Sequence, residues 1–436
     1  MNIRITGLIT AMLITINALA NNVTVSDVVI YGTGPDTATV KFDVQWENSW
    51  RYAVQDDPLY FHDATWIFFK VQKSGESEWL PLILEHAGIN PQGSSTGTGD
   101  PAELLVPSDL LGVFVRRSED GDGSFSAQDI KVVCSLAANE LTKTDQVKIR
   151  AFAQEMVYVP KGSFKVGDGL SDAGQLFEGG GNKNPFEITG AGPIETGNSA
   201  NMLWGASQSG KSTMGGAGTI PAAFPNGYNA FYCMKYEITQ GQYADFLNTL
   251  TRNQQATRCT ANKLNYYMTT SAGGSSVPAN RNTVRVIEAP VAPKPLVFEA
   301  DRPDRGCNWL SWPDVAAFAD WAALRPITEL EFEKACRGPL EPVSGEFAWG
   351  TATIMPDASR TLSGEEDGTE TILSDTSLGG CNYGGKAHIG GDAGQGALRA
   401  GIFADNNSTR IQAGAGYWGI FELSGGCWER GVSIGS

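Results

Sequence analysis

Histidine is scarce in this chain, and the sequence shows no pattern for a site built on histidine. Only three occur in 436 residues, His62, His86 and His388, and each stands apart from the others. Zinc sites and Ser-His-Asp triads need histidine with defined spacing or partners, and the sequence shows neither pattern. We therefore interpret all three as surface or hydrogen-bonded residues, and the sequence predicts no metal ligand and no catalytic residue.

Positive charge is also in short supply. Lys and Arg number 32 against 48 Asp and Glu, which gives a formal net charge of −16 without any basic stripe. This balance argues against nucleic acid and anionic membranes as partners. The 52 glycines and 11 tryptophans instead predict a folded, loop-rich protein with many large apolar anchors.

A long apolar run occurs only within residues 1–20, MNIRITGLITAMLITINALA. Arg4 and the small residues of Ala18-Leu19-Ala20 fit a secretory signal peptide, and the apolar stretch is too short for a membrane span. No later segment is long enough to cross a bilayer. The expected mature protein is secreted, periplasmic or displayed on the cell surface.

The cysteines form no CxxC motif and show no metal-ligand spacing. In an exported protein some can form disulfides, but their pairing cannot be read from sequence, and an odd number leaves at least one thiol unpaired within the chain. The alternative for each is a small buried apolar residue. They lie at positions 134, 233, 259, 307, 336, 381 and 427.

Residues 21–152 are predicted to form a β-sandwich, because short apolar or alternating runs are separated by turns rich in Gly, Asp, Asn and Ser. Within them, Asp120-Gly-Asp122-Gly-Ser124 has the alternating oxygens of a calcium loop, but Lys131 stands where the last glutamate would be. A turn between strands is preferred, and a structural calcium ion is the alternative. The expected strands are 23–31, 37–46, 65–72, 103–106, 113–116, 130–135 and 147–152.

Residues 153–436 show a different pattern. A hairpin of Met156–Val159 and Phe164–Val166 is predicted to open this region, followed by a polar surface insertion over 168–218. Farther on, Thr239 begins a helix with Gln242 at the capping-box position.

Two more helices have clear boundaries in the sequence. Ser311 is the expected N-cap of the first, which stops near Arg325-Pro326. Thr328 and Glu331 form a capping box for the second, which ends at Gly338.

This helix pair, SWPDVAAFADWAALRPITELEFEKACRG, resembles the formylglycine-generating enzyme (sulfatase-modifying factor) family. Further matches stand in the family's order, and together they cover the chain from about residue 155 onward. They are MVYVPKGSFKVG at 156–167, FYCMKYEITQGQYADFL at 231–247, FAWG at 347–350 and GYWGIFELSGGCWE at 416–429.

The resemblance implies an α+β, loop-rich, C-type-lectin-like domain after the β-sandwich. In that family the loops build a groove for an extended peptide or another ligand. Aromatic residues of these loops are the groove candidates here, with burial in the core as the alternative reading. They are Trp349, Tyr383, Tyr417, Trp418 and Trp428.

Catalysis in this family is the oxidation of a substrate cysteine to formylglycine by a cysteine pair with bound copper, placed beyond an SGNxWEW-like motif. In this chain the motif reads SGGCWER, with Gly426 in place of asparagine and Arg430 in place of an aromatic residue. No cysteine can be assigned to the catalytic pair. We expect a domain that is incomplete at its C-terminus, either as a fragment or as a shortened domain, with no cofactor as given and copper only in a complete oxidase.

One apparent motif is discounted. GASQSGKS at 205–212 matches the GxxxxGK[ST] loop of nucleotide-binding proteins. That loop needs a following helix, and STMGGAGTIP at 212–221 cannot form one. We expect no nucleotide binding.

Three functions are compatible with the sequence. The preferred one is an exported, non-catalytic binding or surface-display protein, in which the sandwich is a spacer and the second domain binds an unidentified peptide, protein or glycan. The second is a formylglycine-generating oxidase whose catalytic cysteines lie beyond Ser436. The third is a structural surface-assembly protein.

Overall fold

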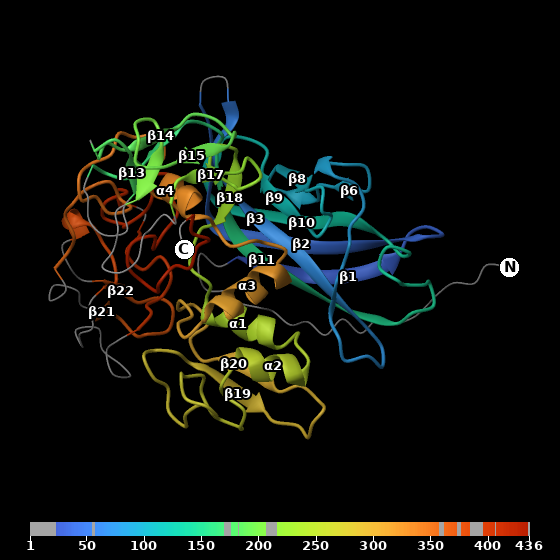
Figure 1. The fold of residues 1–436 in the computed structure, drawn as a ribbon. Helices are drawn as coiled ribbons and strands as arrows, with labels where there is room; N and C mark the ends of the chain where they lie inside the picture. The colour runs from blue at the N-terminus through green and yellow to red at the C-terminus, as the bar shows by residue number, and fades with distance from the viewer. Residues whose placement is uncertain are drawn as a thin grey trace.

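The computed structural model describes residues 23–54, 57–169, 176–181, 183–205, 216–356, 362–372, 376–383, 396–405 and 407–434. Figure 1 shows the long strands of the first third on one side and the helices and irregular loops on the other. Four α-helices accompany many short strands in this described part, as expected for the α+β class. None of these helices is long and apolar enough to span a bilayer.

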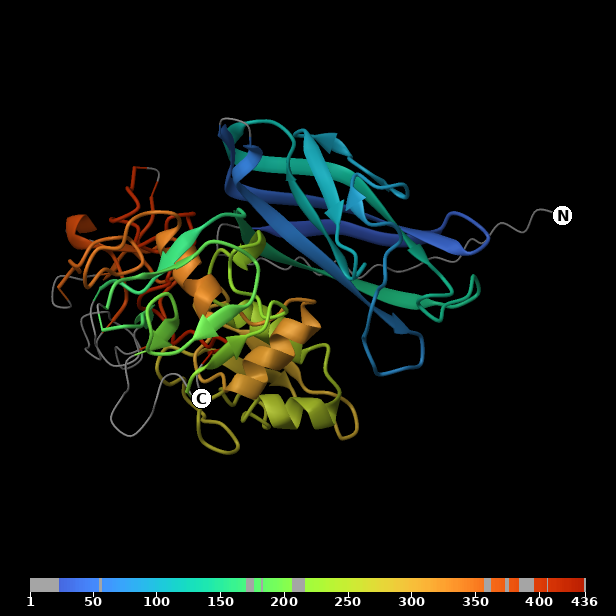
Figure 2. The same cartoon turned by 45° about the horizontal axis from the view of Figure 1, so that its top comes forward.

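The N-terminal strands form one curled sheet instead of the two separate sheets of an ideal sandwich. Within the described residues it contains twelve strands, and β2 pairs with β1 and β10 along most of its length but with β3 at its far end. Figure 2 shows this curl from a second direction. The principal strands are β1 (Thr24–Gly32), β2 (Thr37–Val54), β3 (Asp57–Lys73), β8 (Ala102–Val106), β9 (Gly112–Arg117), β10 (Gly121–Ser135), β11 (Val147–Val159) and β18 (Phe231–Met234).

The two faces of β3 explain why it reads as an almost continuous apolar run. Ile67 and Phe69 point into the core inside the curled sheet, where Phe69 lies 5.5 Å from the ring of Phe42 on β2. Trp66 and Phe68 point to the opposite face and into a second core. A strand buried on both faces loses the apolar-polar alternation that marks a half-exposed strand. Short strands at the sheet margins are β4 (Leu80–Pro81), β5 (Gly88–Ile89), β6 (Ser94–Ser95) and β7 (Thr98–Gly99).

The second core joins this sheet to the helices α1 (Gln240–Leu247) and α3 (Trp312–Trp321). Trp321 packs edge-on against Phe68 at 4.9 Å and against Phe152 at 4.7 Å between ring centroids. Figures 1 and 2 both place α1 beside α3 against this part of the sheet. The N-caps expected at Thr239, Ser311 and Thr328 are confirmed.

Some helix boundaries differ from the expectation. Helix α3 ends at Trp321 and not near Arg325, because Ala322 and Ala323 already leave helical geometry, Ala323 with φ of +55°. Helix α4 (Glu329–Arg337) ends as predicted at Gly338, which adopts a φ of +64°. Helix α2 (Arg252–Arg258) was not predicted, because it is short and polar, although it begins with a complete capping box at Thr251.

The predicted hairpin of Met156–Val159 and Phe164–Val166 is wrong. Strand β11 runs without interruption from Val147 to Val159, pairs first with β3 and then pairs with β18. Phe164–Val166 is β12, which pairs with β14 (Phe186–Ile188). In the turn between β11 and β12, Gly162 N–H donates to the Tyr228 carbonyl at 3.0 Å. The same β11 crosses the domain boundary expected at 152/153.

The insertion over 168–218 packs in a third apolar core, which it shares with β12 and α4. Phe164, Ile188, Ile194 and Leu203 pack there with Leu330 of α4. Its short strands include β13 (Leu176–Glu178), β15 (Ile194–Thr196), β16 (Leu203–Gly205) and β17 (Gly218–Ile220). Loops connect the remaining elements, which are two hairpins and a 3-10 turn. The hairpins are β19 (Val284–Glu288) with β20 (Val297–Ala300) and β21 (Leu362–Ser363) with β22 (Thr371–Ile372), and the 3-10 turn is Thr376–Leu378.

Candidate functional site

Four of the five predicted groove aromatics are anchored inside the fold. Trp349 and Trp418 are buried, and their indole N–H groups donate to the carbonyls of Thr353 and Lys334, each at 3.0 Å. Tyr417 is half-buried and packs edge-on against Trp418 at 4.7 Å. Tyr383 donates its hydroxyl to the Met355 carbonyl at 2.9 Å. These contacts give each of the four a structural role.

Trp428 is different, because 91% of its surface is exposed. The chain on both sides of it is held in place. On one side Cys427 N–H donates to the carboxylate of Glu237. On the other side Val432 N–H donates to the Ile327 carbonyl at 2.8 Å, and Glu329 N–H donates to the Val432 carbonyl at 3.1 Å. Trp428 is thus a large apolar side chain displayed on a fixed segment.

Three carboxyl groups lie close together at this segment, those of Glu237, Glu422 and Glu429, although they are far apart or unmarked in the sequence. Burial raises the pKa of Glu237 well above its usual value, and the charges of Glu422 and Glu429 raise it further. Burial also raises the pKa of both Glu422 and Glu429 to about 7. Gly401 N–H donates to Oε1 of Glu422 at 2.6 Å, whereas Oε2 of Glu422 is buried without a partner. The cluster therefore favours protonated, neutral carboxyl groups.

Two glycines pack directly onto Glu237. A Cβ atom on Gly306 would lie 2.4 Å from Oε2 of Glu237, and one on Gly426 would lie 2.3 Å from Oε1. Gly426 also has a φ of +81°. The family motif has asparagine where this chain has Gly426. Any side chain at position 426 would collide with the Glu237 carboxyl group, which explains the glycine.

The cysteines do not offer a reactive pair. Burial raises the pKa of Cys134 to about 11 and those of Cys233 and Cys259 to about 12. Burial also raises the pKa values of Cys307, Cys336 and Cys427 well above the usual range. These six thiols are therefore protonated at neutral pH, and none of them is an activated nucleophile. Nowhere in the described residues do three or more His, Cys, Asp or Glu side chains form a metal-binding group.

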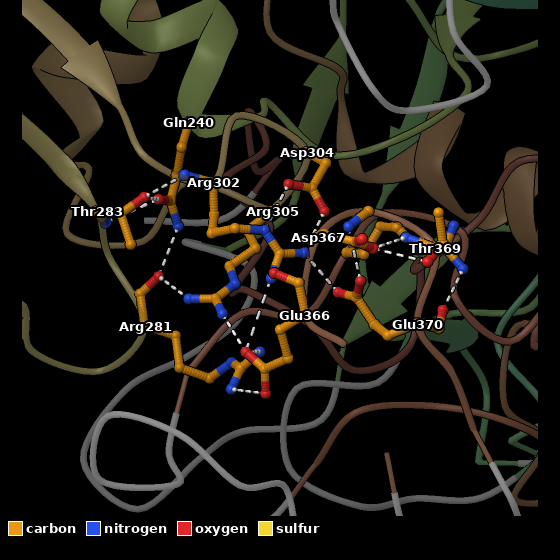
Figure 3. A network of polar contacts seen from close by, with 12 residues as sticks. Gln240, Arg281, Thr283, Arg302, Asp304, Arg305, Glu366, Asp367, Thr369 and Glu370 are labelled. Carbon is orange, nitrogen blue, oxygen red and sulfur yellow. Dashed lines mark hydrogen bonds and ion pairs between the residues drawn. The ribbon is translucent and has the colours of Figure 1, made fainter. Parts of the chain in front are cut away.

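A second buried network consists of arginines and acidic residues (Figure 3). Arg281 binds Glu366 with both terminal nitrogens, at 3.2 and 3.0 Å, and Arg305 binds the same carboxylate. Arg302 binds Asp304 at 2.7 Å and Glu370 at 2.5 Å.

This network attaches the β21–β22 hairpin to the chain that precedes α3. Although burial alone would raise it, hydrogen bonds from Arg302 and from backbone N–H groups hold the pKa of Glu370 below its usual value. Each of these charges has a partner of opposite sign within the fold. The network therefore holds these loops together and is not an open anion site. The sequence signal was a concentration of arginine in an acidic chain. Asp304 is two residues from Arg302, but Glu366 and Glu370 lie more than 60 residues from the arginines that they bind.

His62 is buried and hydrogen-bonded, since its Nε2 lies 2.8 Å from the Tyr232 hydroxyl, while His86 is exposed and His388 falls outside the described residues. Asp120 lies in the turn between β9 and β10 and accepts a hydrogen bond from Ala53 N–H at 3.1 Å. The GASQSGKS motif lies outside the described residues, except for Gly205 at the end of β16.

The family is decided by a match over residues 142–371 to the sulfatase-modifying factor enzyme 1-like domain, which covers more than half of the chain. The chain belongs to this family. The matched residues include β11, β18 and all four helices, and they begin inside the region where the curled sheet joins the helices. The chain matches no curated protein and no solved structure.

Proposed function

We propose that this member of the sulfatase-modifying factor family is an exported, non-catalytic binding or surface-display protein. The observation that carries the proposal is Trp428, which is 91% exposed on a segment held at both ends. Exposed tryptophan on a rigid support is typical of recognition surfaces, because little conformational entropy is lost when it binds. The ligand class is a peptide, a protein or a glycan.

The cysteines support a binding role over an oxidase role. Burial raises the pKa values of six of the thiols, so none of these six is an activated nucleophile near neutral pH. The glycine-packed carboxyl cluster has a positioning role in this proposal, since Glu237 holds the backbone immediately before Trp428.

Array screening tests the proposal. The purified protein is applied to arrayed peptides and glycans, and each hit is measured again with Trp428→Ala. We expect affinity to fall by about tenfold or more, as for a tryptophan at the centre of an interface. Trp312→Ala is the matched control, because Trp312 is also exposed but lies on α3, and it should leave binding unchanged.

Two outcomes contradict the proposal. Formation of an aldehyde on a cysteine-containing peptide incubated with the protein, copper and oxygen identifies an oxidase. Concentration-dependent assembly of the protein without binding to any arrayed ligand identifies a structural protein.

A further inference from the structure

A buried lysine lies between two buried carboxyl groups on three neighbouring strands. Asp63 belongs to β3, Glu155 belongs to β11, and Lys235 directly follows β18, where its backbone N–H donates to the Glu155 carbonyl at 2.9 Å. Strand β11 pairs with β3 on one side and with β18 on the other. Asp63 and Lys235 are each 1% exposed and Glu155 is 5% exposed, so the group is shielded from bulk water.

The amine of Lys235 lies next to both carboxyl groups. Its Nζ is 3.7 Å from Oδ2 of Asp63 and 3.3 Å from Oε2 of Glu155. The Trp50 ring covers the amine, with Nζ 4.5 Å from the ring centroid. Groups held together in this way react as if they were highly concentrated, because the entropy of bringing them together has already been lost on folding.

Lysine at this position is informative, because the other ion pairs with a buried cation in the described residues use arginine, as Arg281 does with Glu366. Unlike a guanidinium group, an amine can give up its proton in a buried site and act as a nucleophile. One ammonium group also balances only one of the two carboxylates, and an unbalanced buried charge is costly. An ion pair alone therefore explains this arrangement poorly.

The Asp63 carboxyl group accepts hydrogen bonds that suit an acyl transfer. Its Oδ1 accepts from the Ser49 hydroxyl at 2.9 Å and from Trp50 N–H at 3.0 Å, while its Oδ2 accepts from the Trp46 indole N–H at 3.1 Å. Two donors on Oδ1 can stabilise the negative charge that this oxygen acquires when a nucleophile adds to Cγ. Burial raises the pKa of Asp63, although the charge of Lys235 and these hydrogen bonds oppose the rise. Burial thus favours the neutral carboxyl group, which is the form that an amine attacks.

We propose that Lys235 and Asp63 form an intramolecular amide bond, with Glu155 as the proton carrier. Glu155 removes a proton from the Lys235 ammonium group, and the nitrogen lone pair forms a bond to Cγ of the protonated Asp63 carboxyl group. The Cγ–Oδ2 bond then breaks, and Oδ2 leaves as water with a proton supplied by Glu155. The nitrogen loses one further proton to Glu155. The products are a neutral amide, one water molecule and a neutral Glu155, so nothing is oxidised or reduced and no charge stays buried.

This amide joins β3 of the curled sheet to the end of β18, two segments that are far apart in the sequence. A cross-link of this kind stabilises a fold by reducing the entropy of the unfolded chain. The site is separate from Trp428 and does not depend on the ligand-binding function proposed above.

Peptide mapping of the full chain, denatured, reduced and digested with trypsin, tests the proposal. We expect the peptide containing Lys235 to be joined to the peptide containing Asp63, with a combined mass lower by one water, about 18 Da, and no cleavage after Lys235. Fragmentation of the joined peptide locates the bond. Lys235→Arg should abolish the joined peptide, because no amine remains. Glu155→Gln should reduce its yield in freshly purified protein by about tenfold or more, because the proton carrier is lost.

Lys334→Arg is the matched control. Lys334 is also buried, but its Nζ contacts the carbonyl oxygens of Pro160 and Gly227, at 2.6 and 2.7 Å, so its replacement should leave the joined peptide unchanged. Separate, full-mass peptides from the parent protein would overturn the proposal and leave the group as a buried ion pair. A joined peptide that persists in Lys235→Arg would overturn it as well. The parent protein gives a decisive result even if a variant fails to fold.

Discussion

The curled sheet and the loop-rich remainder of this chain are stabilised in different ways. The sheet encloses one continuous apolar core, built from alternate residues of long strands. The remainder has several smaller apolar cores, and between them buried charges are matched over long sequence separations, as in the group around Arg281, Arg302 and Glu366. In regular strands the backbone N–H and C=O groups pair through the hydrogen bonds of the sheet. Irregular chain must find a separate partner for each of these groups, and charged side chains provide some of those partners.

The largest expected effect tests whether the two regions unfold together. Phe42→Ala in the sheet core and Phe318→Ala in the helix core each remove a ring that is 0% or 1% exposed, and each should cost about 3 to 5 kcal/mol. Because β11 belongs to both regions, we expect each variant to shift a single urea transition. Two separate transitions, only one of which moves in each variant, would show that the regions fold independently.

The next effect tests the buried charges of the loop-rich region. Glu366→Ala leaves Arg281 and Arg305 without their shared carboxylate and should cost about 2 to 4 kcal/mol. Lys41→Ala is the control in the sheet, because it breaks an exposed ion pair with Asp129 and should leave the free energy of unfolding nearly unchanged. If both variants lost a similar free energy of unfolding in urea denaturation, buried charges would not stabilise the loop-rich region more than exposed charges stabilise the sheet.

A third experiment uses pH. Since the folded-state pKa of Glu422 is raised to about 7, its proton stabilises the fold at low pH, and this contribution is lost as pH rises through about 7. Glu422→Gln should therefore stabilise the protein at pH 8 by about 1 to 3 kcal/mol, and by less at pH 5.5. Thermal melts of the parent protein and the variant at the two pH values measure this difference, and an equal effect of the substitution at both would contradict the prediction.

The smallest effect concerns a helix cap. Thr328 accepts from Glu331 N–H at 3.2 Å and donates to the Pro225 carbonyl at 2.8 Å, so Thr328→Ala should cost about 1 to 2 kcal/mol. Thr251→Ala, at the cap of the more exposed α2, should cost less than that. The reverse order in urea denaturation would show that the burial of Thr328 adds nothing to its capping role.

Strand and helix starts were predictable from sequence because they depend on neighbours a few residues away. Thr239, Ser311 and Thr328 each act with a partner three residues later, and the strands of the N-terminal region follow local apolar patterns. The pairing of Met156–Val159 was not predictable in the same way. Its partner, β18, lies more than 70 residues farther on, and the nearer segment, β12, pairs elsewhere.

The sequence by itself determined the family, the α+β class and the helix caps, since these rest on ordered motifs and short-range spacing. Only the tertiary structure decided which residues meet. It buried Trp349 and Trp418 and left Trp428 exposed, it gathered Glu237, Glu422 and Glu429, and it brought Lys235 between Asp63 and Glu155. Burial and charge clustering depend on contacts between distant segments, and no local pattern encodes them.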